Sequence, residues 1–151
     1  MKLAEALHLR SDLQKRIAQL GDRLNANAKV QEGDDPAEDP VVLLSELENG
    51  TAELARLIAA INLTNRRTVV DGKTLTERIA EKDALALRIS LLRNFIAQAS
   101  SKVDRYSNKE IRIRSTVDVR EQQKKLDVLS KELRELDVKI QGLNWTTDLI
   151  E

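Results

Sequence analysis

Apolar residues recur at intervals of three and four positions along four stretches of this chain. This spacing places them on one face of an α-helix, and such a face is normally buried against other helices. The repeats predict helices over residues 2–26, 40–65, 75–103 and 118–143, give or take a residue or two at each end. The four stripes are Leu13, Ile17, Leu20 and Leu24; Leu44, Leu47, Leu54, Ile58 and Ile61; Leu85, Ile89, Leu92, Ile96 and Ala99; and Leu126, Leu129, Leu133, Leu136, Ile140 and Leu143.

Consecutive helices joined by short connections normally return antiparallel. We therefore predict an all-α fold with a single domain over residues 1–151. It is expected to be an antiparallel up-down four-helix bundle, with long coiled-coil-like helices and short β-strand segments in the connections. Aromatic residues make up only 2% of the chain, so leucine, isoleucine and alanine must fill the core. Such a core suits helix-on-helix packing.

The connections carry recognisable signals for turns and helix ends. Asp39 before Pro40 predicts an N-cap followed by proline at the first helical position. Asp71-Gly72 is a strong signal for a tight hairpin turn between the second and third helices. Gly50 lies inside the second predicted helix and should weaken it by about 1 kcal/mol relative to alanine.

Two segments in the connections look extended and oppositely charged. Apolar and basic residues alternate over residues 110–115, which predicts a short strand. Residues 28–40 hold five acidic side chains and residues 102–114 hold five basic ones, so we expect the two connections to attract one another. They could pair as a ribbon within a subunit or between subunits. The candidate subunit-contact ribbon comprises Lys29, Val30, Gln31, Ile111, Arg112, Ile113 and Arg114.

Polar residues are expected to gather where the end of the second helix meets the C-terminal tail. Asn and Thr are ordinary residues at helix ends, which favours a capping role, with Trp145 covering the base of the core. The alternative is a small-ligand pocket. This candidate polar end cluster consists of Asn62, Asn65, Asn144, Trp145, Thr146 and Thr147.

Other candidate chemistry is sparse. The chain has no cysteine and a single histidine, His8, so a zinc site has too few ligands. The acidic connection lacks the alternating ligand spacing of a calcium loop, and one aromatic residue, Tyr106, beside the basic segment does not make a stacking platform for nucleic acid. We expect no catalytic residues, no cofactor and no metal, and therefore no enzyme.

The composition also bears on partners and location. Basic and acidic residues number 25 each, so no net charge draws the chain to nucleic acid or to an anionic membrane, and self-association meets little repulsion. Charged residues interrupt the N-terminal segment, which lacks the apolar run of a signal peptide, so a cytoplasmic location is expected.

Several short segments resemble a family of short bacterial proteins labelled septicolysin or septicolysin-like. The resemblance spans almost the whole chain, and no catalytic residues come with it. Its label implies a haemolysin. The matching segments are residues 12–20 (DLQKRIAQL), 27–33 (NAKVQEG) with 36–40 (PAEDP), 104–107 (DRYS), 115–119 (STVDV) and 144–148 (NWTTD).

Three functions follow as hypotheses. The leading one is a cytoplasmic structural or protein-interaction module that forms homo-oligomers. The second is a small-ligand-binding protein or enzyme with its site at the polar end cluster. The remote third is the membrane-active toxin that the family label implies, although every predicted helix is heavily charged and a helical pore needs a long apolar span.

Overall fold

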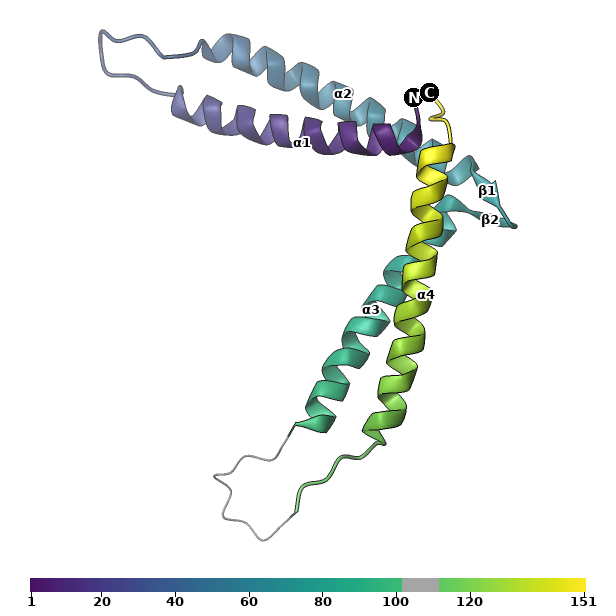
Figure 1. Cartoon of the computed structure of the whole chain (residues 1–151). Helices are drawn as coiled ribbons and strands as arrows, with labels where there is room; N and C mark the ends of the chain where they lie inside the picture. The colour runs from purple at the N-terminus through teal and green to yellow at the C-terminus, as the bar shows by residue number, and fades with distance from the viewer. Residues whose placement is uncertain (102–111) are drawn as a thin grey trace. The chain divides into compact units, whose positions relative to one another are not determined.

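The computed structural model describes residues 1–101 and 112–151. The fold class is all-α with four long helices and a small antiparallel sheet in one connection, which fits a four-helix bundle and confirms the prediction (Figure 1). The chain forms two compact units, residues 1–75 with 141–151 and residues 76–140. The elements in order are α1 (Leu3–Ala26), α2 (Pro40–Arg67), β1 (Val69–Val70), β2 (Lys73–Thr74), α3 (Leu75–Ser100) and α4 (Val119–Thr146).

The helix ends follow their capping residues. Asp39 caps α2, since its side chain accepts a 2.9 Å hydrogen bond from the backbone N–H of Val41, and Pro40 is the first helical residue, as predicted. At the start of α4, Asp118 accepts a 3.2 Å bond from the backbone N–H of Glu121. The main difference is at the other end of α4, which continues to Thr146 rather than ending near residue 143.

The predicted hairpin between α2 and α3 is present. β1 and β2 pair antiparallel, with Val69 opposite Thr74 and Val70 opposite Lys73. The two residues between them, Asp71 and Gly72, both have positive φ, at 51° and 74°. This is the geometry of a two-residue hairpin turn, for which Asp-Gly is a preferred pair.

The predicted strand over residues 110–115 is not formed in its described part. Residues 112–115 are neither helix nor strand, and residues 110 and 111 lie outside the described part of the chain. Residues 29–31 are likewise irregular. An alternating pattern becomes a strand only where it finds a partner to complete its backbone hydrogen bonds, and neither residues 29–31 nor the described residues 112–115 form a strand pairing.

In the first unit, α1 and α2 run antiparallel and side by side (Figure 1). The stripe predicted for α1 is confirmed at Leu13 and Leu20, which are buried. The stripe predicted for α2 is wrong at its first position, because Leu43 is 2% exposed and Leu44 is 55% exposed. The inward positions of α2 are Leu43, Leu47, Gly50, Leu54, Leu57, Ile61 and Thr64.

Gly50 explains the register error in α2. It occupies an inward position, so the apolar repeat lacks a side chain there. A Cβ atom at Gly50 would lie 3.5 Å from Cγ1 of Ile17 on α1, an ordinary contact distance. A hollow of about 150 Å³ lies beside it, lined in part by Leu13 and Leu20.

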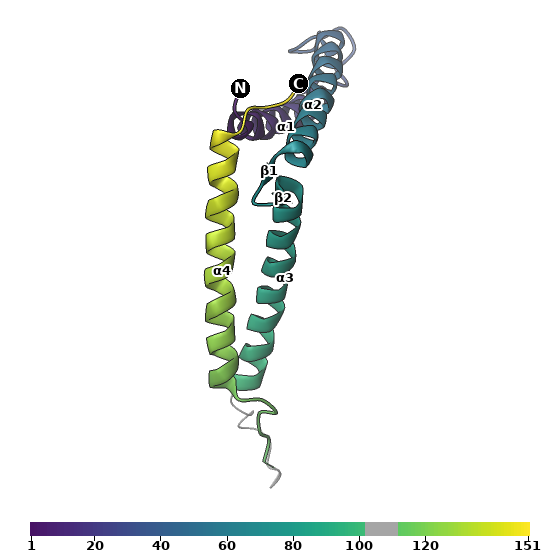
Figure 2. The same ribbon diagram turned by 90° about the vertical axis from the view of Figure 1, so that its right-hand side faces the viewer.

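The second unit is the hairpin of α3 and α4, which lie side by side in both views (Figures 1 and 2). Its core consists of Ile89 and Ile96 from α3 with Leu126 and Leu129 from α4. This confirms the inward faces predicted for both helices. Partly buried side chains extend the core at Leu85, Leu92, Val119 and Leu133.

Candidate functional site

The N-terminal residues pair with the C-terminal tail. The backbone N–H of Leu3 donates a 2.9 Å hydrogen bond to the carbonyl of Thr147, and the N–H of Leu149 donates one of 2.9 Å to the carbonyl of Met1. We call the pairing of these four residues the terminal clasp. It fastens the tail along the start of α1.

Side chains reinforce the terminal clasp. Nζ of Lys2 lies 2.8 Å from Oδ1 of Asp148, and this hydrogen bond lowers the pKa of the Asp148 carboxyl. Farther along the tail, the backbone N–H of Ile150 donates a 2.9 Å bond to Oγ1 of Thr64. That hydroxyl is fully buried on α2 and donates to the carbonyl of Ala60 at 2.8 Å. The tail is therefore tied to both helices of the first unit.

The residues of the polar end cluster have different environments. Asn144 is buried, Asn65 and Thr147 are half-buried, and Asn62 and Thr146 are exposed. Trp145 is 56% exposed, so the prediction that it covers the base of the core is wrong. Because α4 continues through Thr146, Asn144 takes the inward position instead.

Trp145 has a neighbour that the sequence did not indicate. Its ring centroid lies 6.3 Å from that of His8 on α1, with the planes tilted by 42°. The sequence also gave no indication that the N-terminal residues would take part in the terminal clasp. Pairing of backbone groups depends little on side-chain identity, and Met1 and Lys2 carry no local motif for it.

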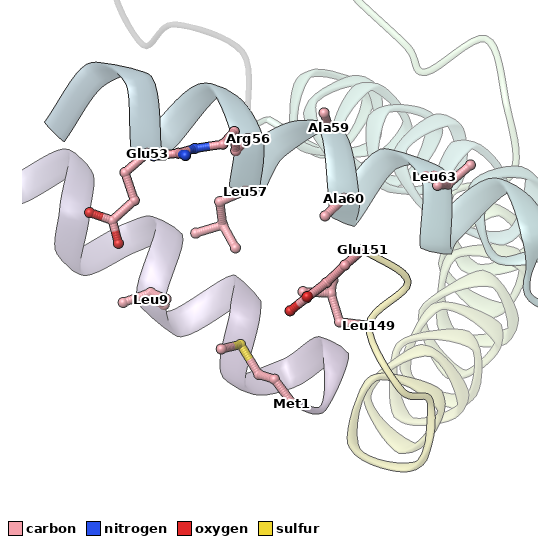
Figure 3. Close-up of a pocket in the computed structure, with 10 residues that line it drawn as sticks. All are labelled: Met1, Leu9, Glu53, Arg56, Leu57, Ala59, Ala60, Leu63, Leu149 and Glu151. Atoms are coloured by element: carbon pink, nitrogen blue, oxygen red, sulfur yellow. The ribbon is translucent and has the colours of Figure 1, made fainter. Parts of the chain in front are cut away.

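A groove runs along the first unit next to the terminal clasp (Figure 3). Its volume is about 650 Å³, within the usual range for small-molecule sites. In Figure 3, Leu57 and Ala60 of α2 point into the same space as Leu149 of the tail. The apolar lining includes Met1, Leu9, Leu57, Ala60, Leu63 and Leu149.

Three charged residues line the same groove. The carboxylate of Glu151 points into the groove, that of Glu53 extends toward α1, and the guanidinium of Arg56 lies along α2 (Figure 3). Glu53 and Arg56 are exposed. The groove therefore combines an apolar floor with two carboxylates and one guanidinium.

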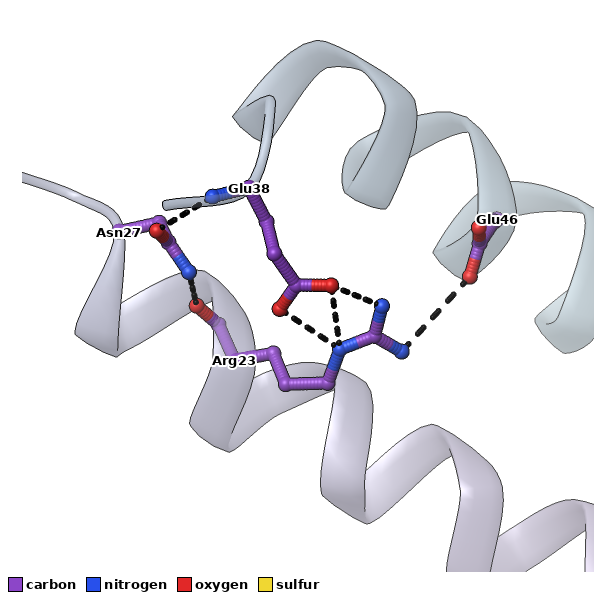
Figure 4. A network of polar contacts seen from close by, with 4 residues as sticks. All are labelled: Arg23, Asn27, Glu38 and Glu46. Atoms are coloured by element: carbon purple, nitrogen blue, oxygen red, sulfur yellow. Dashed lines mark hydrogen bonds and ion pairs between the residues drawn. The ribbon is translucent and has the colours of Figure 1, made fainter. Parts of the chain in front are cut away.

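The far end of the α1–α2 hairpin is held by a polar network (Figure 4). Nε of Arg23 lies 3.0 Å from Oε2 of Glu38, and a terminal guanidinium nitrogen lies 2.5 Å from Oε1. Asn27 is buried beside this pair; its Nδ2 donates to the carbonyl of Arg23 at 2.9 Å, and its Oδ1 accepts from the backbone N–H of Glu38 at 3.0 Å. Glu46 lies 3.9 Å from the guanidinium.

This network uses part of the acidic connection. The hydrogen bond from Arg23 lowers the pKa of Glu38, and the same bond raises the pKa of Arg23. Glu38 of the acidic connection therefore forms an ion pair inside the first unit. The expected attraction between the acidic and basic connections stays a prediction.

α3 exposes a second row of apolar side chains. Leu87, Leu91 and Phe95 are 61%, 60% and 45% exposed. At 100° per residue, these positions share one face with the exposed Ala80 and Ala84. We call these five residues the outer face of α3. It lies on a different side of the helix from the core residues Ile89 and Ile96.

The candidate ribbon residues are surface residues where they are described. Lys29, Val30 and Gln31 are exposed, as are Arg112, Ile113 and Arg114, while Ile111 lies outside the described residues. The subunit contact proposed for them stays a prediction.

The described residues hold neither a cluster of metal-binding side chains nor a helix that could span a membrane. Within residues 1–101 and 112–151, no group of three or more His, Asp or Glu side chains is arranged to hold a metal ion. Over the same residues, none of the helices has the length and apolar character needed to cross a membrane.

The chain is similar to a protein of known structure. A crystal structure of a functionally unknown conserved protein from Corynebacterium diphtheriae is 45% identical, with a TM-score of 0.92 over 99% of each chain. No curated protein matches the chain. The similarity supports the fold and carries no activity with it.

The family match corrects the resemblance drawn from the sequence. Residues 10–149 match a family described as "Family of unknown function (DUF6847)", and neither this match nor the solved structure is septicolysin-like. The assignment to the septicolysin-like proteins is therefore wrong: the segments that suggested it are only four to nine residues long, and stretches of that length recur by chance in unrelated proteins. The chain belongs to the family of unknown function DUF6847.

Proposed function

We propose that this chain is a self-associating helical interaction module, working in the cytoplasm and without catalytic activity of its own. The outer face of α3 carries the proposal. A helix that packs one apolar stripe inside its hairpin and exposes another has a surface suited to a further helix. We assign that position to α3 of a second copy.

The distribution of side-chain sizes along the outer face favours an antiparallel pair. The N-terminal half carries Ala80 and Ala84, and the C-terminal half carries Leu91 and Phe95. A two-fold axis between Leu87 and Arg88 sets Phe95 opposite Ala80 and Leu91 opposite Ala84. Phe95 and Leu91 then each meet an alanine, and the two Leu87 side chains meet at the two-fold axis, which allows the helices to pack closely.

Charge supports the same orientation. Acidic residues Glu77, Glu81 and Asp83 lie in the N-terminal half of α3, and Arg88 and Arg93 lie in the C-terminal half. The N-terminal half also holds two bases, but Arg78 is buried and Lys82 pairs with Asp137 of α4. Antiparallel helices set an acidic half against a basic half, whereas parallel helices would set like charges together. The resulting contact would be isologous and closed, a coiled-coil-like pair of two chains.

Cysteine crosslinking tests this register directly, because the chain has no cysteine of its own. In Leu87→Cys the two thiols would be offset by only about 1.5 Å along the helices, and a disulfide should form readily on oxidation. In Phe95→Cys they would be about 22 Å apart, and none should form. The double variant Ala80→Cys/Phe95→Cys should crosslink again.

The oligomeric state gives a second test. Sedimentation at micromolar to high micromolar concentration should show a dimer, which Leu91→Glu converts to a monomer with unchanged helicity. Val138→Glu is the control, since Val138 is 70% exposed on α4, away from the outer face. A wild-type monomer across this range, or a dimer unaffected by Leu91→Glu, would contradict the proposal.

A further inference from the structure

The groove beside the terminal clasp is a separate feature from the outer face of α3. We propose that it binds a linear aliphatic ammonium compound, with the alkyl chain along α2 and the cationic group beside the two carboxylates. The proposal does not depend on self-association, since all the residues that line the groove belong to the first unit.

The dimensions of the groove suit a chain-like ligand. Its lining on α2 runs from Glu53 to Leu63, a span of about 15 Å at the α-helical rise. Leu57 and Ala60 form the floor, and Leu9 and Leu149 form the walls. Each methylene group buried against such a surface raises the affinity roughly fourfold, so a medium-length alkyl chain gains affinity along its length.

Charge selects a cationic head group. Within the described part of the chain, neither Glu53 nor Glu151 makes a side-chain hydrogen bond or ion pair. Figure 3 shows the Glu151 carboxylate directed into the groove, while the Arg56 guanidinium follows α2. An ammonium group placed between the acidic side chains would be attracted, and a carboxylate there would be repelled.

Ligand binding is expected to act on the terminal clasp. Met1 and Leu149 belong both to the clasp and to the groove. A ligand that contacts Met1 and Leu149 only while the terminal clasp is formed stabilises the clasp by mass action. The backbone N–H of Leu149, which donates to Met1, should therefore exchange with solvent more slowly when the groove is occupied.

Calorimetric titration of the full chain tests the proposal, with decyltrimethylammonium below its micelle concentration as the probe. Decanoate is the matched probe of opposite charge and should bind at least severalfold more weakly. Glu53→Gln and Glu151→Gln should each weaken binding of the cation by severalfold, while Glu48→Gln, on α2 but outside the groove, should leave it unchanged.

Blocking the groove completes the test. Ala60→Phe should remove binding, and circular dichroism checks that the variant folds. Leu91→Glu, which alters the outer face of α3, should leave binding intact and so separates this proposal from the dimer. Three results would overturn the proposal: decanoate binding as tightly as the cation, cation binding that neither Glu53→Gln nor Glu151→Gln weakens, or loss of cation binding in Leu91→Glu.

Discussion

The two helical hairpins of this protein use similar helices in different ways. In the first unit, polar contacts secure both ends: Arg23 and Asn27 hold Glu38 at one end, and the terminal clasp holds the tail at the other. In the second unit, α3 packs one apolar stripe against α4 and exposes another. The first arrangement holds both ends of a hairpin in place, whereas the second leaves an apolar face of one helix exposed to solvent.

Paired substitutions on α3 should give the largest contrast. Ile89→Ala removes a side chain that is 3% exposed and should lower the free energy of unfolding by about 2–4 kcal/mol. Leu91→Ala, two residues away, should change it by less than about 0.5 kcal/mol in dilute solution. Urea unfolding at low protein concentration measures both. Similar losses would show that the outer face is already covered in the monomer.

Asn27→Ala should cost the first unit about 1–3 kcal/mol, because it removes two hydrogen bonds from a buried site at the end of α1. Asn25→Ala is the control, since Asn25 is exposed and its side chain makes no hydrogen bond in the described structure. Thermal unfolding of both variants compares them, and equal melting temperatures would assign the network no role in stability.

Gly50→Ala should stabilise the protein by about 0.5–1 kcal/mol. Alanine favours the helix, and its Cβ fits against Ile17 at an ordinary contact distance. Gly33→Ala should have the opposite effect, since Gly33 has a φ of 92° that alanine adopts only with strain. A destabilised Gly50→Ala would mean that α1 and α2 approach more closely than described.

The smallest effect should be a pH dependence at Glu38. Its pKa is lower in the folded chain than in the unfolded chain, because Arg23 donates hydrogen bonds to it. The ion pair therefore adds stability at neutral pH, and this contribution disappears as the pH falls through the folded-state pKa. The difference in stability between wild type and Glu38→Gln should be largest at neutral pH and vanish in acid. A constant difference would point to another cause.

The sequence was most informative where a local signal and an apolar repeat agreed. Asp39-Pro40 marked the start of α2, and Asp71-Gly72 marked the hairpin turn. The repeat alone failed in α2, because Gly50 interrupts the inward row and makes Leu44 look like the better continuation than Leu43. One missing side chain was enough to shift the predicted face.

The candidate sites were harder to predict because they depend on long-range contacts. The sequence indicated that the tail meets the end of α2, and the bond from Ile150 to Thr64 is such a contact. It gave no sign that Met1 and Leu3 join the tail through their backbones. The outer face of α3 was present as Leu87, Leu91 and Phe95, but the strong stripe at Leu85 and Ile89 masked it.

The pairing of His8 with Trp145 has a practical consequence for folding studies. Trp145 is the sole tryptophan of the chain and lies in the first unit, beside the terminal clasp. Its emission therefore monitors the opening of that region, while circular dichroism at helical wavelengths reports on all four helices. Denaturation curves that separate between the two signals would reveal independent unfolding of the hairpins, and curves that coincide would indicate one cooperative transition.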